Sequence, residues 1–232
     1  MMKKRLLVVA SAILVFAMMA TACGQTSAPA AKTDEFLSQL NATYTELFPE
    51  LNKDEYYSYW EEAVIPFSGE ENAETYIQML QSACVGTIYG EDAIAAYPDM
   101  ESAQFNCFFI NGVDEITINN NNISGKLDGK EVFSHVYSYQ EDKSMGGMMD
   151  VRVYKTADKD AGEFTYFLFC PDTPDSTYHI EFRYGSDLDE LLKVVEGDYA
   201  YWLAAGIPVG SDAEFVKACI ALFAEENLSE GE

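Results

Sequence analysis

The chain has two histidines, His135 and His179, and these are the residues best suited to chemistry. His135 alternates along a predicted strand with Phe133, Tyr137 and Tyr139, so these four side chains share one face. If that face lines the interior of a barrel, His135 is a candidate pocket residue or metal ligand. A hydrogen-bonded, partly buried structural histidine is the alternative interpretation.

His179 lies on the strand face that also carries Glu181 and Arg183. This pattern indicates a solvent-facing histidine in a ladder of charges. The chain contains no Gly-x-Ser-x-Gly, His-Glu-x-x-His, P-loop or Gly-x-Gly-x-x-Gly motif, and neither histidine belongs to a recognisable triad. No spacing of carboxylates points to glycoside hydrolysis. The sequence therefore predicts a protein that is not an enzyme.

Aromatic residues are abundant, with 15 tyrosines and 14 phenylalanines. A barrel of about eight strands is either filled by such side chains or left open as an aromatic pocket. Five tyrosines are the candidates to line such a pocket: Tyr137, Tyr139, Tyr184, Tyr199 and Tyr201.

A group of acids follows the last predicted strand. It comprises Asp187, Asp189, Glu190, Glu196 and Asp198. Calcium takes six or more oxygen ligands from such residues, but the EF-hand pattern is absent. A helix N-terminus and a solvated acidic face explain most of these positions.

The charge of the chain is strongly negative, with 14 basic and 39 acidic residues and a net charge of −25. A surface of this kind repels nucleic acid and attracts cations. Solubility and distance from an anionic envelope are the simpler explanation of the charge. The sequence therefore predicts no nucleic-acid partner.

The first 22 residues have the features of an export signal. Lys3, Lys4 and Arg5 precede an apolar run of residues 6–19, and small residues lead to Cys23. A cysteine in this place is typical of a bacterial lipoprotein signal, so we expect Cys23 to be lipidated and to anchor the protein outside the cytoplasm. Residues 23–32 are small and polar, which predicts a flexible tether.

Four further cysteines, Cys84, Cys107, Cys170 and Cys219, have no CxxC motif or regular spacing. Export permits disulfides. Cys170 ends an apolar strand and Cys219 lies on the apolar face of a helix, so buried free thiols are the first interpretation of both. One bridge is feasible, but the sequence does not pair it.

The predicted elements change type twice along the chain. Apolar residues at helical spacing predict helices within residues 33–98: one from residue 33 that Pro49 stops, one over 54–64 closed by Pro66, and one over 73–84. Residues 105–184 then alternate in strand fashion, and residues 187–226 return to helical spacing after Asp187 and after a Ser211–Glu214 capping box.

Seven strands are predicted within residues 105–184. Asn111-Gly112 and Asp128-Gly129 are strong hairpin signals, and residues 140–147 are expected to be a loop. The last hairpin pairs residues 164–170 with residues 178–184. The strands cover residues 105–110, 113–118, 123–127, 131–139, 150–155, 164–170 and 178–184. Consecutive antiparallel strands with short turns predict a meander that closes into a small barrel, flanked by N- and C-terminal helices in one α+β domain over residues 33–232.

Three segments resemble the ZinT (YodA-like) family, which also forms the C-terminal domain of AdcA-type zinc lipoproteins. NGVDEITINNNNISGKLDGKEVF is similar to its early barrel strands. GEFTYFLFCPDTPDSTYHIEFRY is similar to its aromatic strand ending in Cys, the turn and the next strand. IPVGSDAEFVKACI is similar to its closing segment. The resemblance covers most of the mature domain and implies a calycin (lipocalin-like) fold.

The resemblance also implies zinc as a cofactor and a metal-uptake system as partner. The family binds zinc through three histidines at the barrel mouth, but the matching positions here are Tyr184-Gly185 and Asp198-Tyr199-Ala200-Tyr201. Phenols are poor zinc ligands at neutral pH. We therefore expect divalent-metal handling with degenerate ligands. A metal-free binder of a small apolar or aromatic ligand, or a surface interaction module, are the alternatives.

Overall fold

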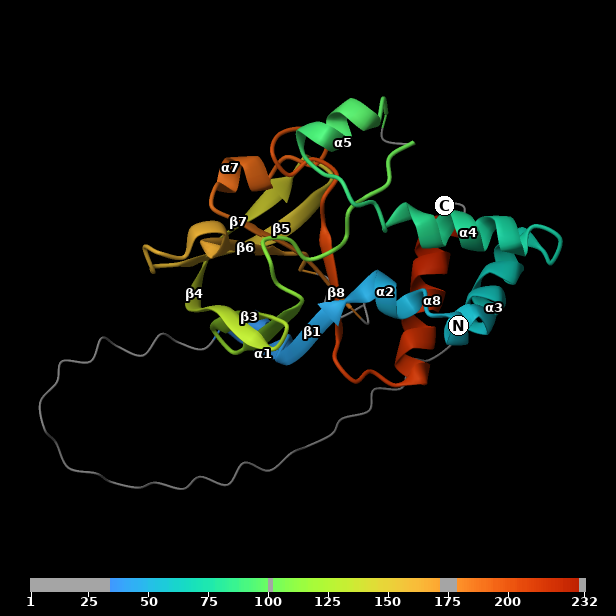
Figure 1. The fold of residues 1–232 in the computed structure, drawn as a ribbon, viewed down its shortest axis with the longest axis horizontal. Helices are drawn as coiled ribbons and strands as arrows, with labels where there is room; N and C mark the ends of the chain where they lie inside the picture. Colours follow the sequence, from blue (N-terminus) through green and yellow to red (C-terminus); the bar gives the residue numbers. More distant parts are fainter. Residues whose placement is uncertain (1–33, 100–101, 172–178, 230–232) are drawn as a thin grey trace, which may run out of the picture. The chain divides into compact units, whose positions relative to one another are not determined.

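The computed structural model describes residues 34–99, 102–171 and 179–229, and its centre is a closed barrel of antiparallel strands (Figure 1). Neighbours in the barrel follow chain order, and β1 pairs with β8 to close it. The strands are β1 (Ala42–Glu46), β2 (Glu115–Asn119), β3 (Asn122–Leu127), β4 (Lys130–Met145), β5 (Met149–Thr156), β6 (Tyr166–Phe169), β7 (Ile180–Gly185) and β8 (Ala204–Pro208). The predicted α+β meander barrel with flanking helices is confirmed.

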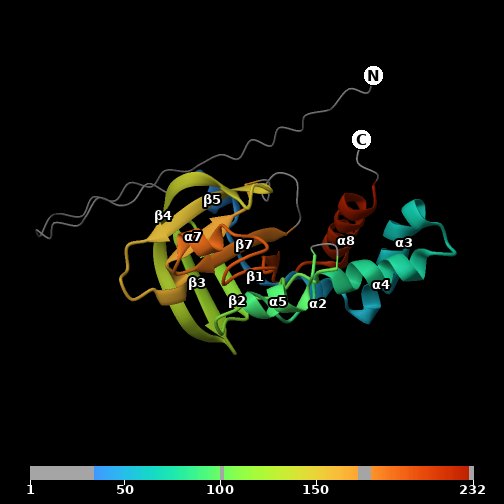
Figure 2. The same cartoon turned by 90° about the horizontal axis from the view of Figure 1, so that it is seen from above.

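The helices lie before, between and after the strands, and the described residues belong to one compact unit, Lys32–Glu232. Figure 2 shows α3, α4 and α8 grouped on one side of the barrel. None of the described helices is both long and apolar enough to cross a membrane. The helices are α1 (Glu35–Gln39), α2 (Leu47–Leu51), the 3₁₀ helix η1 (Asp54–Tyr56), α3 (Tyr57–Ser68), α4 (Ala73–Ala83), α5 (Glu91–Ala96), the 3₁₀ helix η2 (Gly162–Phe164), α7 (Leu188–Leu191) and α8 (Ala213–Leu228).

The two strands that close the barrel were not predicted, so the barrel runs from residue 42 to residue 208 rather than over residues 105–184. β1 interrupts the predicted first helix because Thr43, Tyr44 and Thr45 alternate, with only Tyr44 buried. β8 lies within residues 187–226, which were predicted to be helical. Its small and apolar residues are buried on both faces, since one face lines the barrel and the other packs against the helices.

Residues 105–110, predicted to be a strand, form no strand in the structure. Asn106 makes only isolated bridges, to Val85 and to Trp202. Asn111 and Gly112 have φ angles of 60° and 71°, the backbone of a tight turn, but no hairpin forms around them. Asp128 and Gly129, with φ angles of 50° and 74°, do connect paired strands β3 and β4, as predicted.

Several predicted boundaries differ from the structure for local reasons. β4 continues through the predicted loop at residues 140–147 and turns only at Gly146, because its whole C-terminal half pairs with β5. α3 extends past Pro66 to Ser68. The predicted helix after Asp187 is only the four-residue α7. The cap of α8 is Asp212, which accepts a hydrogen bond from the backbone N–H of Phe215, rather than Ser211.

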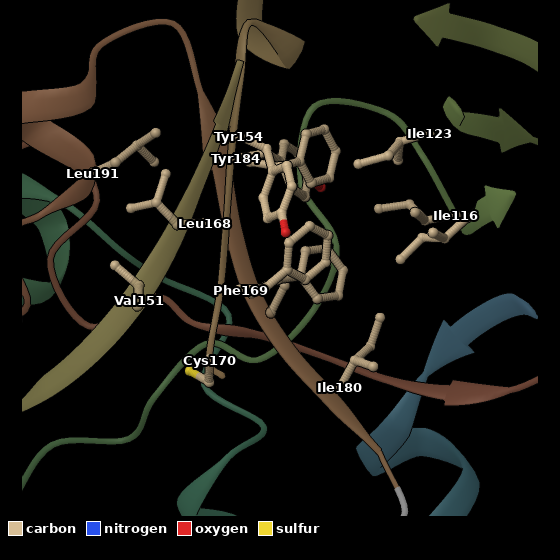
Figure 3. Close-up of a cluster of buried hydrophobic side chains, with 14 of the residues drawn as sticks. Ile116, Ile123, Val151, Tyr154, Leu168, Phe169, Cys170, Ile180, Tyr184 and Leu191 are labelled. Atoms are coloured by element: carbon tan, nitrogen blue, oxygen red, sulfur yellow. The ribbon is translucent and has the colours of Figure 1, made fainter. Parts of the chain in front are cut away.

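Aromatic rings fill the barrel interior. Phe167 lies 5.1 Å from Tyr184 and 5.2 Å from Tyr137 between ring centroids. Figure 3 shows Tyr154, Phe169 and Tyr184 gathered on the inner side of the strands, with Ile116 and Ile123 opposite them. The interior rings with less than 2% exposure are Tyr137, Tyr154, Phe167, Phe169, Phe182 and Tyr184. Ile180, Phe182 and Tyr184 of β7 share this buried face.

The opposite face of β7 was predicted to be wet, and this is wrong. Arg183 is 1% exposed and His179 is 9% exposed. The segment after β7 folds back over this face, so that Leu191 lies beyond Leu168, on the outer side of the strands (Figure 3). Arg183 Nη1 donates hydrogen bonds to the backbone oxygens of Leu191, at 3.0 Å, and of Lys193. Burial lowers the pKa of Arg183 to about 10.

The buried tyrosines predict a loss of stability at alkaline pH. Burial raises the pKa of Tyr44 to about 12, and it raises the pKa values of Tyr137, Tyr154 and Tyr184 as well. In the unfolded chain these phenols ionise near pH 10, so the stabilisation is complete below about pH 10 and is lost as the pH rises toward 12. Each such tyrosine then removes about 1.4 kcal/mol per pH unit from the free energy of unfolding.

Urea unfolding at several pH values above about 9 measures this slope, with tyrosinate absorbance as the readout of ionisation. The Tyr44→Phe variant is the control, and its slope should be shallower than that of the wild type. A free energy of unfolding that stays constant through this range would contradict the prediction.

Candidate functional site

Two of the five tyrosines predicted to line a pocket, Tyr137 and Tyr184, are part of the filled interior. The Tyr137 hydroxyl donates to the backbone oxygen of Phe164. The Tyr184 hydroxyl donates to the backbone oxygen of Ile110 at 2.8 Å and accepts from its N–H at 2.7 Å. Both phenols thus fasten connecting segments to the barrel, which is a structural role.

The other three tyrosines lie in three different places. Tyr139 is 38% exposed and stacks under the guanidinium of Arg152. Tyr201 packs in a separate cluster with Tyr97 and Phe105, and Tyr199 reaches the barrel rim near Glu163. Among the described residues, the five tyrosines therefore do not line a common pocket.

A hydrogen-bonded cluster occupies the rim where the resemblance implies the zinc ligands. Glu163 accepts hydrogen bonds from Tyr199, at 2.9 Å to Oε2, and from Ser186, at 2.9 Å to Oε1. A Cβ atom added to Gly185 would lie 2.5 Å from the Tyr199 hydroxyl, so a larger residue does not fit there. Burial and the hydrogen bond to Glu163 raise the pKa of Tyr199.

This rim does not fit zinc. The Tyr199 phenol stays protonated at neutral pH, Gly185 has no side chain, and the Tyr184 hydroxyl is used by the backbone of Ile110. Within the described ranges, no group of three or more His, Cys, Asp or Glu residues is close enough to hold a metal ion.

His135 lies at the edge of the barrel, where its ring stacks on Phe133 with 6.0 Å between centroids. Its Nδ1 is 2.8 Å from Oδ2 of Asp158, which follows β5. The His135 side chain is 14% exposed, whereas that of Asp158 is 54% exposed. A carboxylate in this position fixes the orientation and tautomer of the ring, and it leaves Nε2 as the nitrogen with a lone pair.

An open depression of about 640 Å³ lies between the first half of β4 and the segment that contains η2. Stacked rings of Phe133 and Phe164, 3.9 Å apart, contribute its apolar part. Its charged liners are all acidic apart from the imidazole of His135. The full lining comprises Asn111, Glu131, Val132, Phe133, Ser134, His135, Asp160, Ala161, Gly162, Glu163 and Phe164.

One wall of this depression is a strand edge without a partner strand. β4 pairs with β3 from Lys130 to Val136, but its pairing with β5 begins only at Tyr137. The Tyr137 N–H donates to Asn121 O at 2.7 Å, so alternate residues face β3 and the residues between them face away. The β3–β4 register shifts beside Val132, so the alternation applies to Ser134 and Val136, and their outward side faces no partner strand among the described strands because β5 pairs with β4 only from Tyr137 onward.

The remaining predicted site residues have structural roles or lie elsewhere. His179 Nε2 is 3.5 Å from Glu181 Oε1. The Asp187 side chain caps α7 by accepting from the N–H groups of Asp189 and Glu190, as the helix N-terminus interpretation expects. Cys23 lies outside the described residues.

Comparison with known proteins gives structural neighbours only, since no protein-family model and no curated protein matches the chain. It is similar to the Zn(II)-bound ZinT-like domain of Streptococcus pneumoniae AdcA, with 15% identity and a TM-score of 0.49 over 88% of this chain and 95% of that one. It is also similar to Zn(II)-bound AdcA of the same organism, with 14% identity and a TM-score of 0.48. The match covers 86% of this chain but 37% of that protein's length.

Only some of the residues that shape the depression could be predicted from the sequence. His135 was a candidate because of its strand face, but Asp158 and Glu163 were not. Asp158 is 23 positions from His135 in sequence, and no motif spacing connects them. One feature of the sequence could have predicted the free edge of β4. The turn after β5, residues 157–162, is longer than a tight hairpin requires, so the chain leaves the sheet there.

Proposed function

We propose that this chain is an extracytoplasmic lipoprotein, anchored through Cys23, whose barrel binds an extended, basic segment of a partner protein along β4. The observation that carries this proposal is the edge of β4 around Ser134 and Val136, which no described strand pairs with. An unpaired edge offers a row of backbone donors and acceptors to an added strand, and main-chain hydrogen bonds supply the affinity.

The dimensions of the edge suit this role. Residues 131–136 span about 20 Å at the usual rise of a strand, which is the length of a typical strand. Val132 is 45% exposed and Val136 is 56% exposed, so apolar side chains of an added strand would find partners on this face.

The charge around the edge selects the partner. Glu131, Asp160 and Glu163 line the depression, and none of the described residues that line it is lysine or arginine. Glu131, Asp160 and Glu163 are all exposed, and the Glu163 carboxylate already accepts hydrogen bonds from Tyr199 and Ser186. A bound segment with lysine or arginine at alternate positions would therefore be favoured over an acidic one.

Ser134→Pro tests the docking. A proline here removes an N–H on the side of β4 that no described strand pairs with, and edge positions of this kind tolerate proline. We expect the affinity for a fluorescein-labelled peptide of alternating valine and lysine to fall about tenfold or more, measured by fluorescence anisotropy.

Ser134→Ala is the matched control, because it removes the same hydroxyl and keeps the N–H. It should bind like the wild type, and higher salt should weaken binding in both proteins. Equal peptide affinity in the Ser134→Pro variant, with an unchanged melting temperature, would exclude docking on this edge.

A second candidate function, favoured by the contact of His135 with Asp158, is loose capture of divalent cations for a metal-uptake system. The carboxylate fixes the ring, and the acidic residues of the depression raise the local concentration of cations. The described residues contain no group of three His, Cys, Asp or Glu ligands. A metal ion bound here would therefore keep most of its water ligands, and its affinity would be low.

Calorimetric titration with zinc measures this capture. We expect a dissociation constant between about 10 µM and 1 mM, loss of the saturable heat in His135→Ala, and weakening in Asp158→Asn. Glu62→Gln, which removes a carboxylate paired with Lys217 on the helical side, serves as the control for net charge. Identical titrations of wild type and His135→Ala would reject the site.

The proposed anchor has its own test. The wild-type protein should fractionate with membranes and carry a lipid detectable by mass spectrometry, whereas Cys23→Ser should not be lipidated. A wild-type protein recovered from the cytosol with its first 22 residues intact would overturn the proposed location.

A further inference from the structure

Two cysteines that are distant in sequence lie opposite each other beside the helices. Cys84 directly follows α4, and the next residue, Val85, forms an antiparallel bridge with Asn106. The N–H of Gly86 donates to Phe105 O at 3.0 Å, which extends the same register. Cys84 directly precedes this bridge on one segment and Cys107 directly follows it on the other, so both cysteines lie on the same side of the Val85–Asn106 pair.

The two side chains also point toward each other. The Cys84 and Cys107 thiols are hydrogen-bonded, and this bond, together with burial, raises the pKa of Cys107. Cys107 is 7% exposed and belongs to the apolar cluster of the helical side, while Cys84 is partly exposed at its margin. The pair therefore has one buried sulfur and one that reagents reach from solvent.

We propose that Cys84 and Cys107 form the disulfide of this protein when it meets a disulfide oxidant such as oxidised glutathione or an extracytoplasmic thiol oxidoreductase. The Cys84 thiolate attacks the oxidant's disulfide and releases one reduced thiol. The Cys107 sulfur, after losing its proton, then attacks Cys84 in the mixed disulfide and releases the second thiol. Two protons leave and the oxidant accepts two electrons, so the exchange balances.

The second exchange is the slower one, for a structural reason. Cys107 is buried, and a protonated thiol does not attack a disulfide. Closure of the bridge should therefore accelerate as the pH rises, while the first attack at Cys84 depends mainly on access. A Cys84–glutathione adduct should accumulate briefly before the bridge closes.

The bridge would join two parts of the fold that are otherwise held by packing. It links the end of α4 to the segment that leads toward β2, and it closes a loop that contains α5. Covalent closure of a loop of this length restricts the unfolded chain. For a domain of this size we expect the melting temperature to rise on the order of 10 °C.

The other two cysteines provide internal controls. The Cys170 thiol contacts Met149 Sδ at 3.8 Å beside β5. Cys219 lies on the buried side of α8, and burial raises its pKa to about 12. We expect both to remain thiols under conditions that oxidise Cys84 and Cys107.

Peptide mapping of the oxidised protein tests the pairing. The purified protein is incubated with oxidised glutathione, alkylated after unfolding, and digested with a protease that cleaves after glutamate. Cleavage after Glu91 and Glu101 separates the two cysteines, so only a disulfide keeps their peptides together. Trypsin would not resolve them, because the sequence has no lysine or arginine between Lys53 and Lys126.

The expected result is one linked pair, Cys84 with Cys107, and alkylation of Cys170 and Cys219. The rise in melting temperature should persist in Cys170→Ser and Cys219→Ser and disappear in Cys84→Ser and Cys107→Ser. A stable glutathione adduct on Cys84 with Cys107 still alkylated, or any other pairing, would overturn the proposal. The mapping uses purified protein, so its result does not depend on where the protein lies in the cell. If the protein proved to be cytosolic but formed this bridge in vitro, the proposed location would be wrong and the proposed disulfide would stand.

Discussion

Closure of the barrel around a filled aromatic interior is the constraint on which the rest of the structure depends. β1 and β8 come from opposite ends of the domain and pair with each other to complete the ring of strands. The rings of Tyr137, Phe167 and Tyr184 then occupy the space that in wider barrels holds a ligand. Burial of this much aromatic surface is a major source of stabilisation. Because the rings fill the interior, a binding site must lie outside it.

The connecting segments are placed by the same interior. Tyr184 holds the backbone of Ile110, and Tyr137 holds that of Phe164, so polar ends of buried rings fix two loops at the rim. Glu163 lies beside Phe164 and is therefore brought to Tyr199 and Ser186. A rim satisfied by these hydrogen bonds has no ligand set for zinc, although its position corresponds to the metal site that the resemblance implies.

The fold covers the outer faces of β7 and β8, and it leaves one edge of β4 without a partner strand among those described. The segment around α7 covers Arg183, and α2 and α8 cover the outer side of β8. By contrast, β4 is longer than its partner β5, and its first half keeps one free edge. Strand length and strand pairing, rather than residue type, therefore decide where this barrel can receive another chain.

The sequence by itself determined the fold class, most strands and the turn at Asp128-Gly129, because local alternation and turn chemistry act within a few residues. Only the tertiary structure decided that Ala42–Glu46 and Ala204–Pro208 are strands, that Arg183 is buried, and that Cys84 faces Cys107. Each of these depends on a partner far away in sequence, and no local pattern contains the position of such a partner.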